Sequence, residues 1–388
     1  MADALNPQPE VLRVGVIGAG TISGKYSVSI ERLPQLRVTA VADLDLARAQ
    51  TLADRHPGAR AAPVPDLLAA DDVDVVLNLT QPAQHADVAH AAIAAGKHVY
   101  GEKPLATSVA EAREVVKAAT AAGLRLGCAP DTVLGTGIQT ARAVVDSGAI
   151  GTPHSATAFM TTPGHERWHH APEFYYQPGG GPLLDMGPYY LTALVHLLGP
   201  VVQVLGASSR PREDRVVGSG PRAGTSFAVS VDSHVTGLLR HASGALSTLV
   251  VSFDTWAARV PRIEVHGTGG SLSVPDPNHF AGTVELYSAA TAPAPGTTGD
   301  ANWVDVGVRA GLVGSGRGYG LADLALALAE GRPHRAGDEV AMHVLDVMES
   351  VQAAADSQTA VTLTTRCERP AAVDGLVDLA RPVPRGGH

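Results

Sequence analysis

Short apolar runs alternate with amphipathic stretches along the first 130 residues of the chain. The runs are rich in Val, Ile and Leu, as buried strands are, and occupy residues 11–17, 37–42, 75–79, 98–100 and 124–128. The stretches between them have helical composition and occupy residues 45–55, 83–95 and 108–123, with Asp66 placed to cap a further short helix. This alternation predicts a doubly wound parallel sheet of the Rossmann type, over residues 11–130.

The pattern changes beyond residue 130. Strand-like runs now follow one another with long gaps, at residues 155–160, 201–207, 226–239, 244–253, 262–266, 271–274 and 283–287. Helices are expected among them at residues 136–147, 188–198, 321–330 and 340–355, and surface loops at 208–224 and 289–320. We therefore predict a second α/β domain over residues 131–388, with a large, open, mostly antiparallel sheet. Residues 1–10 are expected to be a disordered tail.

Composition places the chain among globular proteins with room for two domains. It has 388 residues, of which 45% are apolar and 17% charged. The formal charge of −9 offers no electrostatic attraction to nucleic acid or to an anionic membrane. Only Cys128 and Cys367 are present, which favours neither a disulfide framework nor a zinc site. Without a signal-peptide pattern or an apolar run of about 20 residues, we expect a cytoplasmic protein.

The stretch after the first run predicts a dinucleotide site. Gly18-Ala19-Gly20 joins the strand to a helix that begins near Thr21 and Ile22, which places amide donors at the helix start for a pyrophosphate. Asp43 ends the next strand and suits the hydroxyls of an adenosine ribose. Because Asp43 and Asp45 would repel a 2′-phosphate, and no Arg follows Asp43, we expect NAD rather than NADP. An ordinary βα turn is the alternative.

Two further clusters carry candidate chemistry. Lys103 follows a short strand and precedes Pro104, which could carry a cis bond, at the sheet edge where α/β proteins bind ligands. Farther on, three consecutive glycines at 179–181 precede Asp185 and Tyr189, which are four residues apart and can share one helix face. The alternatives are a lysine in a surface turn, and an Asp that caps a helix beside a packed Tyr.

These motifs together resemble the Gfo/Idh/MocA family of oxidoreductases. The segments that carry the resemblance are the glycine turn, residues 80–85, Glu102-Lys103-Pro104, the glycine cluster with Asp185 and Tyr189, and residues 264–272, 323–325 and 342–345. The resemblance implies an NAD-binding Rossmann domain and a C-terminal sheet through which homodimers or homotetramers form. It also implies essential roles for Lys103 and Asp185.

The chain departs from many relatives at two places. Tyr189 stands where many members have His, although some have Tyr. Residues 129–132 read Ala-Pro-Asp-Thr, where many relatives have a sequence rich in Asn and Arg. The surroundings of the substrate or the nicotinamide are therefore expected to differ there.

The resemblance implies hydride transfer between a carbinol carbon and nicotinamide. Lys103 would stabilise the alkoxide, Tyr189 would act as general base or acid, and Asp185 would orient Lys103 or bind a substrate hydroxyl. The residues expected to contact the cofactor are Gly18, Gly20, Thr21, Ile22, Asp43, Leu44, Thr80, Gln81, Pro82, His85, Glu102 and Lys103.

The substrate is expected to be a sugar, glycoside or cyclitol. The loop before the glycine cluster offers aromatic rings and hydrogen-bonding side chains, which suit an apolar ring face with many hydroxyls. The residues expected to bind substrate are Lys103, Trp168, His169, Tyr176, Asp185 and Tyr189, with Trp256 as a possible neighbour. No metal is expected. A loop packed only for structure is the alternative.

Three other functions stay open at this stage. A glycosidase or coupled oxidoreductase of the same fold would retain NAD through each turnover. A dihydrodiol-type dehydrogenase would share the Tyr pattern. A non-catalytic sugar sensor would keep the fold without the chemistry, and the joint presence of Lys103, Asp185 and Tyr189 opposes it.

Overall fold

The computed structural model describes residues 11–293 and 302–380, and these fold into two compact units. The first unit holds residues 11–134, 312–341 and 376–380, and the second holds the described residues between 135 and 311 together with 342–375. The predicted division at residue 130 placed all later residues in one domain. Instead, 312–341 and 376–380 return to the first unit. The predicted tail, residues 1–10, lies outside the described residues.

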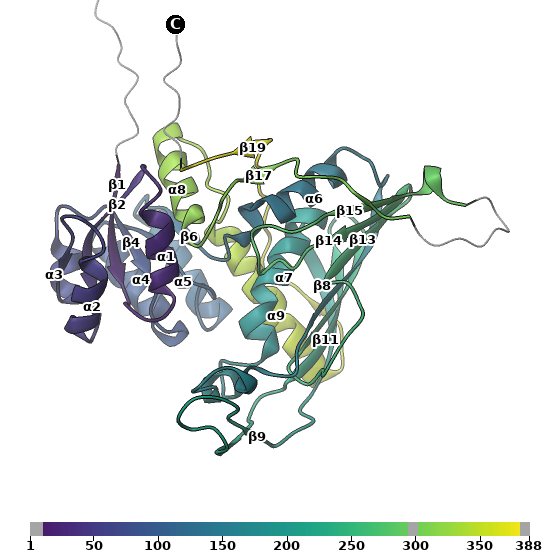
Figure 1. Cartoon of the computed structure of the whole chain (residues 1–388), viewed down its shortest axis with the longest axis horizontal. Helices are drawn as coiled ribbons and strands as arrows, with labels where there is room; N and C mark the ends of the chain where they lie inside the picture. The colour runs from purple at the N-terminus through teal and green to yellow at the C-terminus, as the bar shows by residue number, and fades with distance from the viewer. Residues whose placement is uncertain (1–10, 294–301, 381–388) are drawn as a thin grey trace, which may run out of the picture. The chain divides into compact units, whose positions relative to one another are not determined.

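The sheet of the first unit is wholly parallel, as predicted. Its six strands have the order β3-β2-β1-β4-β5-β6. Several of them are labelled in Figure 1, where this part of the ribbon is purple to blue. The order switches between β1 and β4, the position at which open α/β sheets bind ligands. The strands are β1 (Leu12–Ile17), β2 (Leu36–Ala42), β3 (Arg60–Ala61), β4 (Val75–Asn78), β5 (His98–Gly101) and β6 (Leu126–Cys128).

Helices follow the strands of this sheet and begin where the sequence offers capping groups. Asp45 accepts hydrogen bonds from the first backbone amides of α2, and Ser108 accepts one from Glu111 at the start of α5. Asp66, however, lies inside the first turn of α3 and does not cap it. The helices are α1 (Ser23–Ile30), α2 (Leu46–Ala53), α3 (Val64–Ala69), α4 (His85–Ala94), α5 (Val109–Ala121) and α8 (Tyr319–Glu330), with 3-10 turns η1 (Pro82–Gln84) and η2 (Thr132–Leu134).

The second unit is built on a large, mostly antiparallel sheet, which confirms the predicted fold class. Its order is β16-β15-β14-β13-β7-β12-β11-β8-β18, and only the β7–β12 pair is parallel among these neighbours. The strands are β7 (Pro153–Thr161), β8 (Val201–Ser209), β11 (His234–His241), β12 (Leu246–Ser252), β13 (Ile263–Gly267), β14 (Gly270–Val274), β15 (Glu285–Ser288), β16 (Val304–Asp305) and β18 (Val361–Thr362).

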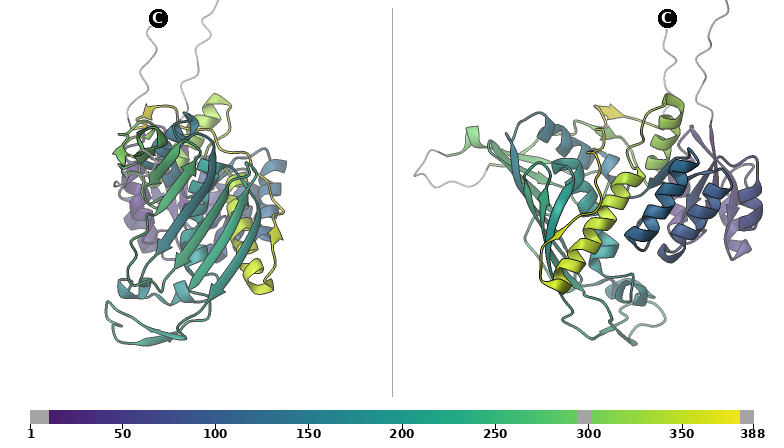
Figure 2. Two further views of the ribbon diagram at one scale, coloured as in Figure 1. Left: turned by 90° about the vertical axis from the view of Figure 1, so that its right-hand side faces the viewer. Right: turned by 180° about the vertical axis from the view of Figure 1, so that it is seen from behind.

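Helices cover one face of this sheet. They are α6 (Thr136–Asp146), α7 (Pro182–Leu198) and the later part of α9 (Asp338–Ser357). α9 lies so close to β8 that a Cβ on Gly206 would stand 2.2 Å from the carbonyl oxygen of Val351. Figure 2 (left) looks onto the strands with these helices behind them. None of the described helices has the length and hydropathy that crossing a membrane needs.

Three details of the chain after residue 134 differ from the predictions. The run 226–239 forms two strands, β10 (Ser226–Ala228) and β11, and β10 pairs with β9 (Asp214–Val216) inside the predicted loop 208–224. Short strands β16 and β17 (Gly311–Leu312) lie within the predicted loop 289–320, and β17 pairs with β19 (Leu376–Val377). Helix α7 begins at Pro182 and not at Pro188, because Gly181 in a positive-φ conformation followed by proline is a favourable helix start.

Candidate active site

The turn after β1 has the open backbone that a pyrophosphate requires. Gly18 adopts φ +104°, and a Cβ there would lie 2.6 Å from the carbonyl oxygen of Leu79, so the turn needs glycine. Gly20 has no neighbouring atom within 4 Å of where its Cβ would stand. The Ser23 hydroxyl donates to the Gly20 carbonyl at 2.7 Å and closes the turn onto α1. The geometry therefore fits a dinucleotide held by the first amides of α1.

Asp43 lies beside this turn and helps to shape it. Its Oδ2 accepts a hydrogen bond from the Ala19 N–H at 2.7 Å, and its Oδ1 accepts one from the Asp45 N–H at 2.8 Å. The carboxylate keeps further lone pairs for ribose hydroxyls. Leu44 next to it and Thr21 at the turn are exposed, whereas Ile22 is half-buried. Direct contacts of these residues with a cofactor stay predictions.

The segment after β4 is held by a buried residue that the sequence analysis did not select. Asn78 Oδ1 accepts hydrogen bonds from the hydroxyl and amide of Thr80, and its Nδ2 donates to the His85 carbonyl at 3.1 Å. The His85 ring is buried, with Nδ1 2.6 Å from the Pro104 carbonyl oxygen and Nε2 3.1 Å from that of Thr80. His85 thus positions the loop that carries Lys103. Gln81 and Pro82 are exposed at the turn.

Glu102 is also occupied within the fold. Its Oε1 accepts a hydrogen bond from the Tyr26 hydroxyl at 2.8 Å, and its Oε2 accepts one from the Lys103 amide at 3.1 Å. Burial, and secondly the Glu102 charge, raise the pKa of Tyr26 well above its ordinary value, so Tyr26 stays a donor. The Lys103–Pro104 peptide bond is cis, as the sequence allowed. Tyr26 on α1 therefore holds the Glu102 carboxylate, and Glu102 in turn orients the Lys103 backbone.

The departure at residues 129–132 has a structural explanation within the first unit. Asp131 is fully buried and its Oδ2 accepts hydrogen bonds from the amides of Gly318 and Gly320, at 2.8 and 3.1 Å. Arg317 Nη1 lies 3.9 Å from its other oxygen. Burial raises the pKa of Asp131 despite the Arg317 charge. Asp131 thus holds the returning segment at the start of α8 against the end of β6.

The second candidate cluster lies at the start of α7. Gly179 and Gly181 have positive φ, and a Cβ on Gly180 would stand 2.5 Å from the Phe174 carbonyl oxygen, so the predicted close backbone approach is confirmed. Asp185 lies in the first helical turn and does not cap the helix. Its Oδ2 is 3.0 Å from the Nε2 of His165, a residue that the sequence analysis did not select. Tyr189 follows one turn later and is buried.

An aromatic surface adjoins this cluster. The His165 ring contacts the rings of Trp168, Tyr175 and Phe253, with centroids 5.2, 4.6 and 4.4 Å away. Trp168 is 60% exposed, so it offers a ring face to a ligand. Burial, and secondly a neighbouring imidazole, lower the pKa of His169, which favours the neutral ring. Within residues 11–293 and 302–380, no cluster of His, Cys, Asp and Glu has the makings of a metal site.

Tyr176 does not belong to this surface, contrary to the prediction that it binds substrate. Its side chain is fully buried, its hydroxyl donates to Glu166, and the same oxygen accepts a hydrogen bond from the His165 amide at 3.1 Å. Glu166 in turn pairs with the buried Arg215 at 2.8 Å. Burial first, and then the bond to Glu166, raise the pKa of Tyr176. Tyr176 therefore supports the loop from within.

The predicted catalytic residues belong to both units. Asp185 and Tyr189 share α7 in the second unit, whereas Lys103 lies in the first. The sequence missed His165 because its pairing with Asp185 arises from two segments twenty residues apart. The only advance signal was its place in the aromatic loop.

Comparisons with known proteins agree with this organisation. Residues 12–129 match the model of the oxidoreductase family with an NAD-binding Rossmann fold, and residues 138–273 match the GFO/IDH/MocA C-terminal domain. The dTDP-3,4-didehydro-2,6-dideoxy-α-D-glucose 3-reductase of Actinomadura kijaniata is 32% identical over 62% of this chain and 72% of its own. The trans-1,2-dihydrobenzene-1,2-diol dehydrogenase of Bos taurus is 31% identical over 69% and 75%.

A solved structure supports the fold. A levoglucosan dehydrogenase in complex with NADH and L-sorbose superposes with a TM-score of 0.76 and 21% identity, over 92% of this chain and all of its own.

Proposed function

The chain belongs to the GFO/IDH/MocA family of NAD-binding oxidoreductases, and we propose that it transfers hydride between nicotinamide and a secondary alcohol of a sugar, glycoside or cyclitol. The observation that carries the proposal is the pairing of Asp185 with His165 beside an exposed aromatic surface. Aromatic faces and ionisable hydrogen-bonding groups together suit a carbohydrate ring. The names of the relatives, which include a dTDP-sugar reductase and a 1,5-anhydro-D-fructose reductase, support the same substrate class.

NAD, when bound at the glycine turn, would supply the hydride acceptor or donor. Lys103 would place its ammonium on the carbinol oxygen and stabilise the negative charge that develops there. Tyr189 would take the hydroxyl proton during oxidation and return it during reduction. Asp185, oriented by His165, would hold Lys103 or a neighbouring substrate hydroxyl in place. The roles of Lys103, Asp185 and Tyr189 are those expected from the sequence.

The test is NADH absorbance after mixing the purified protein with NAD and a panel of monosaccharides, glycosides and inositols. We expect the signal to grow with at least one of them. Lys103→Met should lower kcat by orders of magnitude and leave the Kd for NAD nearly unchanged. Lys117→Met is the matched control, because Lys117 is exposed on α5 and pairs only loosely with Glu114 at 3.8 Å. Near-normal turnover in Lys103→Met would refute the assignment.

A dihydrodiol-type dehydrogenase is the second candidate. The 31% identity to the bovine dihydrodiol dehydrogenase and the exposed rings of Trp168 and Phe174 favour it. The same assay with a trans-dihydrodiol separates the two, because a carbohydrate enzyme should prefer the polyhydroxylated substrate. A burst of one NADH per protein without release would instead indicate an enzyme that retains its cofactor.

We also propose that the chain forms a homodimer or homotetramer through the nine-stranded sheet. Leu205, Leu238 and Leu246 project from it with exposures of 45, 43 and 38%, and Leu205 and Leu238 are direct neighbours across β8 and β11. Such a partly apolar surface suits a second copy. Light scattering after gel filtration should give a dimer or tetramer mass, and Leu238→Lys should shift it toward the monomer. A monomeric wild type would refute this proposal.

We also propose that the protein is located in the cytosol. Both Cys128 and Cys367 are buried free thiols, which is the form that a reducing compartment maintains. Fractionation of the native host cells followed by immunoblotting would test it, and recovery outside the cytosolic fraction would refute it.

A further inference from the structure

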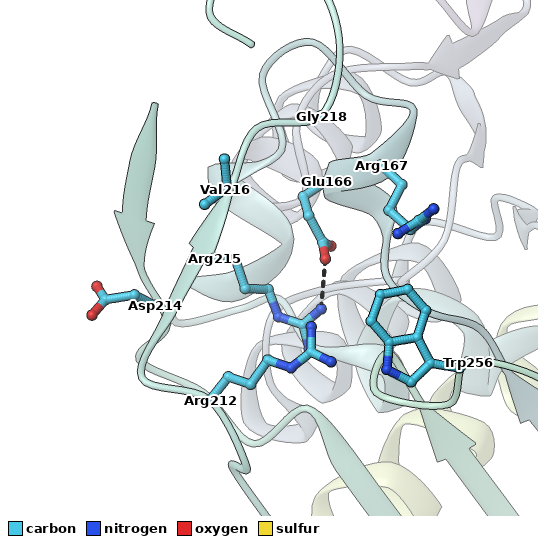
Figure 3. A pocket seen from close by; sticks show the side chains of 8 residues that line it. All are labelled: Glu166, Arg167, Arg212, Asp214, Arg215, Val216, Gly218 and Trp256. Carbon is cyan, nitrogen blue, oxygen red and sulfur yellow. Dashed lines mark hydrogen bonds and ion pairs between the residues drawn. The ribbon is translucent and has the colours of Figure 1, made fainter. Parts of the chain in front are cut away.

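A hollow opens on the second unit, next to the loop that carries His165. It encloses about 440 Å³ between the 3-10 turn η3 (His165–Arg167), the β9–β10 hairpin and the loop after β12. Figure 3 shows the side chains that line it, among them Arg167, Arg212, Arg215 and Trp256. A volume of this size can hold a group as large as a monosaccharide or a phosphate ester. From the sequence, Trp256 is expected only to border a pocket.

The wall of this hollow is a buried ion-pair network whose carboxylates are already engaged. Arg215 is 1% exposed and pairs with Glu166 at 2.8 Å and with Asp254 at 2.5 Å. Glu166 also accepts the Tyr176 hydroxyl, and Asp254 accepts the Ser233 hydroxyl at 2.6 Å. The Nε of Arg215 is buried and has no hydrogen-bond partner among the described residues. Because this atom is buried, Arg215 supports the wall of the hollow and does not offer that donor to an occupant.

Two further guanidinium groups face the open side. Arg167 forms no ion pair with any described carboxylate, and Arg212 reaches Asp254 only at 3.8 Å. Both stand over the indole of Trp256, at 5.1 and 5.4 Å from its ring. The carboxylate of Asp214, which also lines the hollow, points away from them in Figure 3. Two cations therefore converge on an indole that is 66% exposed.

The hollow and the candidate catalytic helix share a wall of two short segments. In η3, His165 turns toward Asp185 while the next two residues, Glu166 and Arg167, line the hollow. In the other segment, Phe253 contacts the His165 ring at 4.4 Å, and Trp256 lies three residues later. Three residues span at most about 11 Å. The hollow and the His165–Asp185 pair therefore lie on neighbouring segments of the second unit.

We propose that this hollow binds the anionic group of an anionic carbohydrate, namely a sugar that carries a phosphate or a carboxylate. The planar guanidinium groups of Arg167 and Arg212 match the paired oxygens of either anion, and Trp256 supplies the apolar face beside it. The inference deepens the proposed function and rests on it for the reacting end of the sugar. The anionic site goes beyond the proposed function in two ways: the substrate carries a negative charge, and Arg167, Arg212 and Trp256 bind that charged group.

Equilibrium binding tests the site without turnover. The full-length protein is titrated calorimetrically at low salt with D-glucose 6-phosphate, D-glucuronate and uncharged D-glucose, and inorganic phosphate is added as a competitor. We expect at least one anionic sugar to bind about tenfold or more tightly than glucose, because a charge-assisted hydrogen bond contributes about that much. High salt and phosphate should weaken that binding. The better ligand of the two shows whether the site takes a phosphate or a carboxylate.

Single variants assign the effect to the two arginines. Arg167→Gln and Arg212→Gln should each weaken binding of the anionic sugar about tenfold and leave glucose unaffected. Arg309→Gln is the matched control, since Arg309 is exposed elsewhere in the second unit and its Nε donates only to a backbone carbonyl. Circular dichroism checks that each variant is folded.

The outcomes separate the two proposals. Anionic sugars that bind no better than glucose, or that bind equally well to both arginine variants, overturn the anionic site. NADH production from neutral sugars would meanwhile leave the proposed function standing. Arginine-dependent binding of an anionic sugar without NADH production would support the site and reject hydride transfer on that sugar.

Discussion

Mild acid should destabilise the second unit through His343. This side chain lies on α9, is fully buried, and its Nε2 accepts a hydrogen bond from the Val201 N–H at 3.0 Å, where β8 begins. A protonated ring has no lone pair at Nε2 and would lose that bond. Burial lowers the pKa of His343 from 6.5 to about 4, with a neighbouring His241 adding to the effect.

The direction and size follow from these two values. Between pH 6.5 and about 4 the unfolded chain binds a proton at this ring that the folded chain does not, so the free energy of unfolding falls as the pH falls. At 1.36 kcal/mol per pH unit, His343 alone should remove about 2 kcal/mol between pH 7 and pH 5, and about 3 kcal/mol at its limit below pH 4.

Urea unfolding at pH 7 and pH 5, followed by tryptophan fluorescence, measures this change. All three tryptophans, at 168, 256 and 303, belong to the second unit, so the signal reports that unit. In His343→Gln the amide oxygen can still accept the Val201 N–H but does not titrate. The variant should therefore lose about 2 kcal/mol less than the wild type over this pH interval.

The control is His154→Gln, because His154 is exposed on β7. It should lose as much stability as the wild type. The pKa of His241 is also lowered by burial, but His241 is present in all three proteins and cancels in the comparison. If His343→Gln loses as much stability on acidification as the wild type, the ring does not titrate as the structure requires and the reasoning is refuted.

Three further substitutions test other parts of the structure. Gly18→Ala should destabilise the first unit, because residue 18 has φ +104° and the new Cβ would stand 2.6 Å from a backbone oxygen. Gly20→Ala places its Cβ in open space, so it should keep the melting temperature and weaken NAD binding in a fluorescence titration. Equal melting temperatures for the two variants would contradict this. Tyr176→Phe should lower the unfolding free energy by about 1–3 kcal/mol, because it leaves Glu166 short of a donor, and should leave KM for the substrate unchanged; a raised KM with unchanged stability would restore Tyr176 to the binding surface. His165→Gln should lower kcat about tenfold, because it removes the imidazole contact that helps to orient Asp185. The Kd for NAD should not change, and an unchanged kcat would show that this pair is structural.

Local rules predicted much of the fold. The alternation of apolar runs with capped helices identified the parallel sheet, because strand and helix periodicity act over a few residues. The helix predicted at residues 108–123 is α5, which Ser108 caps, while the Glu111 carboxylate accepts the Thr107 amide. The same rules failed for α7. From the sequence, the helix is expected to begin at Pro188, but it begins earlier, at Pro182, directly after Gly181.

The candidate site shows a similar division. Gly18, Gly20 and Asp43 stand where a strand–turn–helix motif must place them, so their arrangement could be predicted from neighbouring residues. Tyr176 and His165 lie in the same loop. Tyr176 is expected from the sequence to bind substrate but is fully buried and bonds to Glu166, whereas His165 was not selected and pairs with Asp185. Nothing in the local sequence separates these outcomes.

The sequence by itself thus determined the two α/β architectures, the dinucleotide turn and the family, because these follow from periodicity and from short motifs whose geometry is local. Only the tertiary structure decided which polar side chains meet. Arg215 and Glu166 are 49 residues apart, and Asp131 and Gly318 are 187 apart. Such contacts depend on how whole elements pack and on which groups lose water together, and residues that distant in the chain carry no shared local signal.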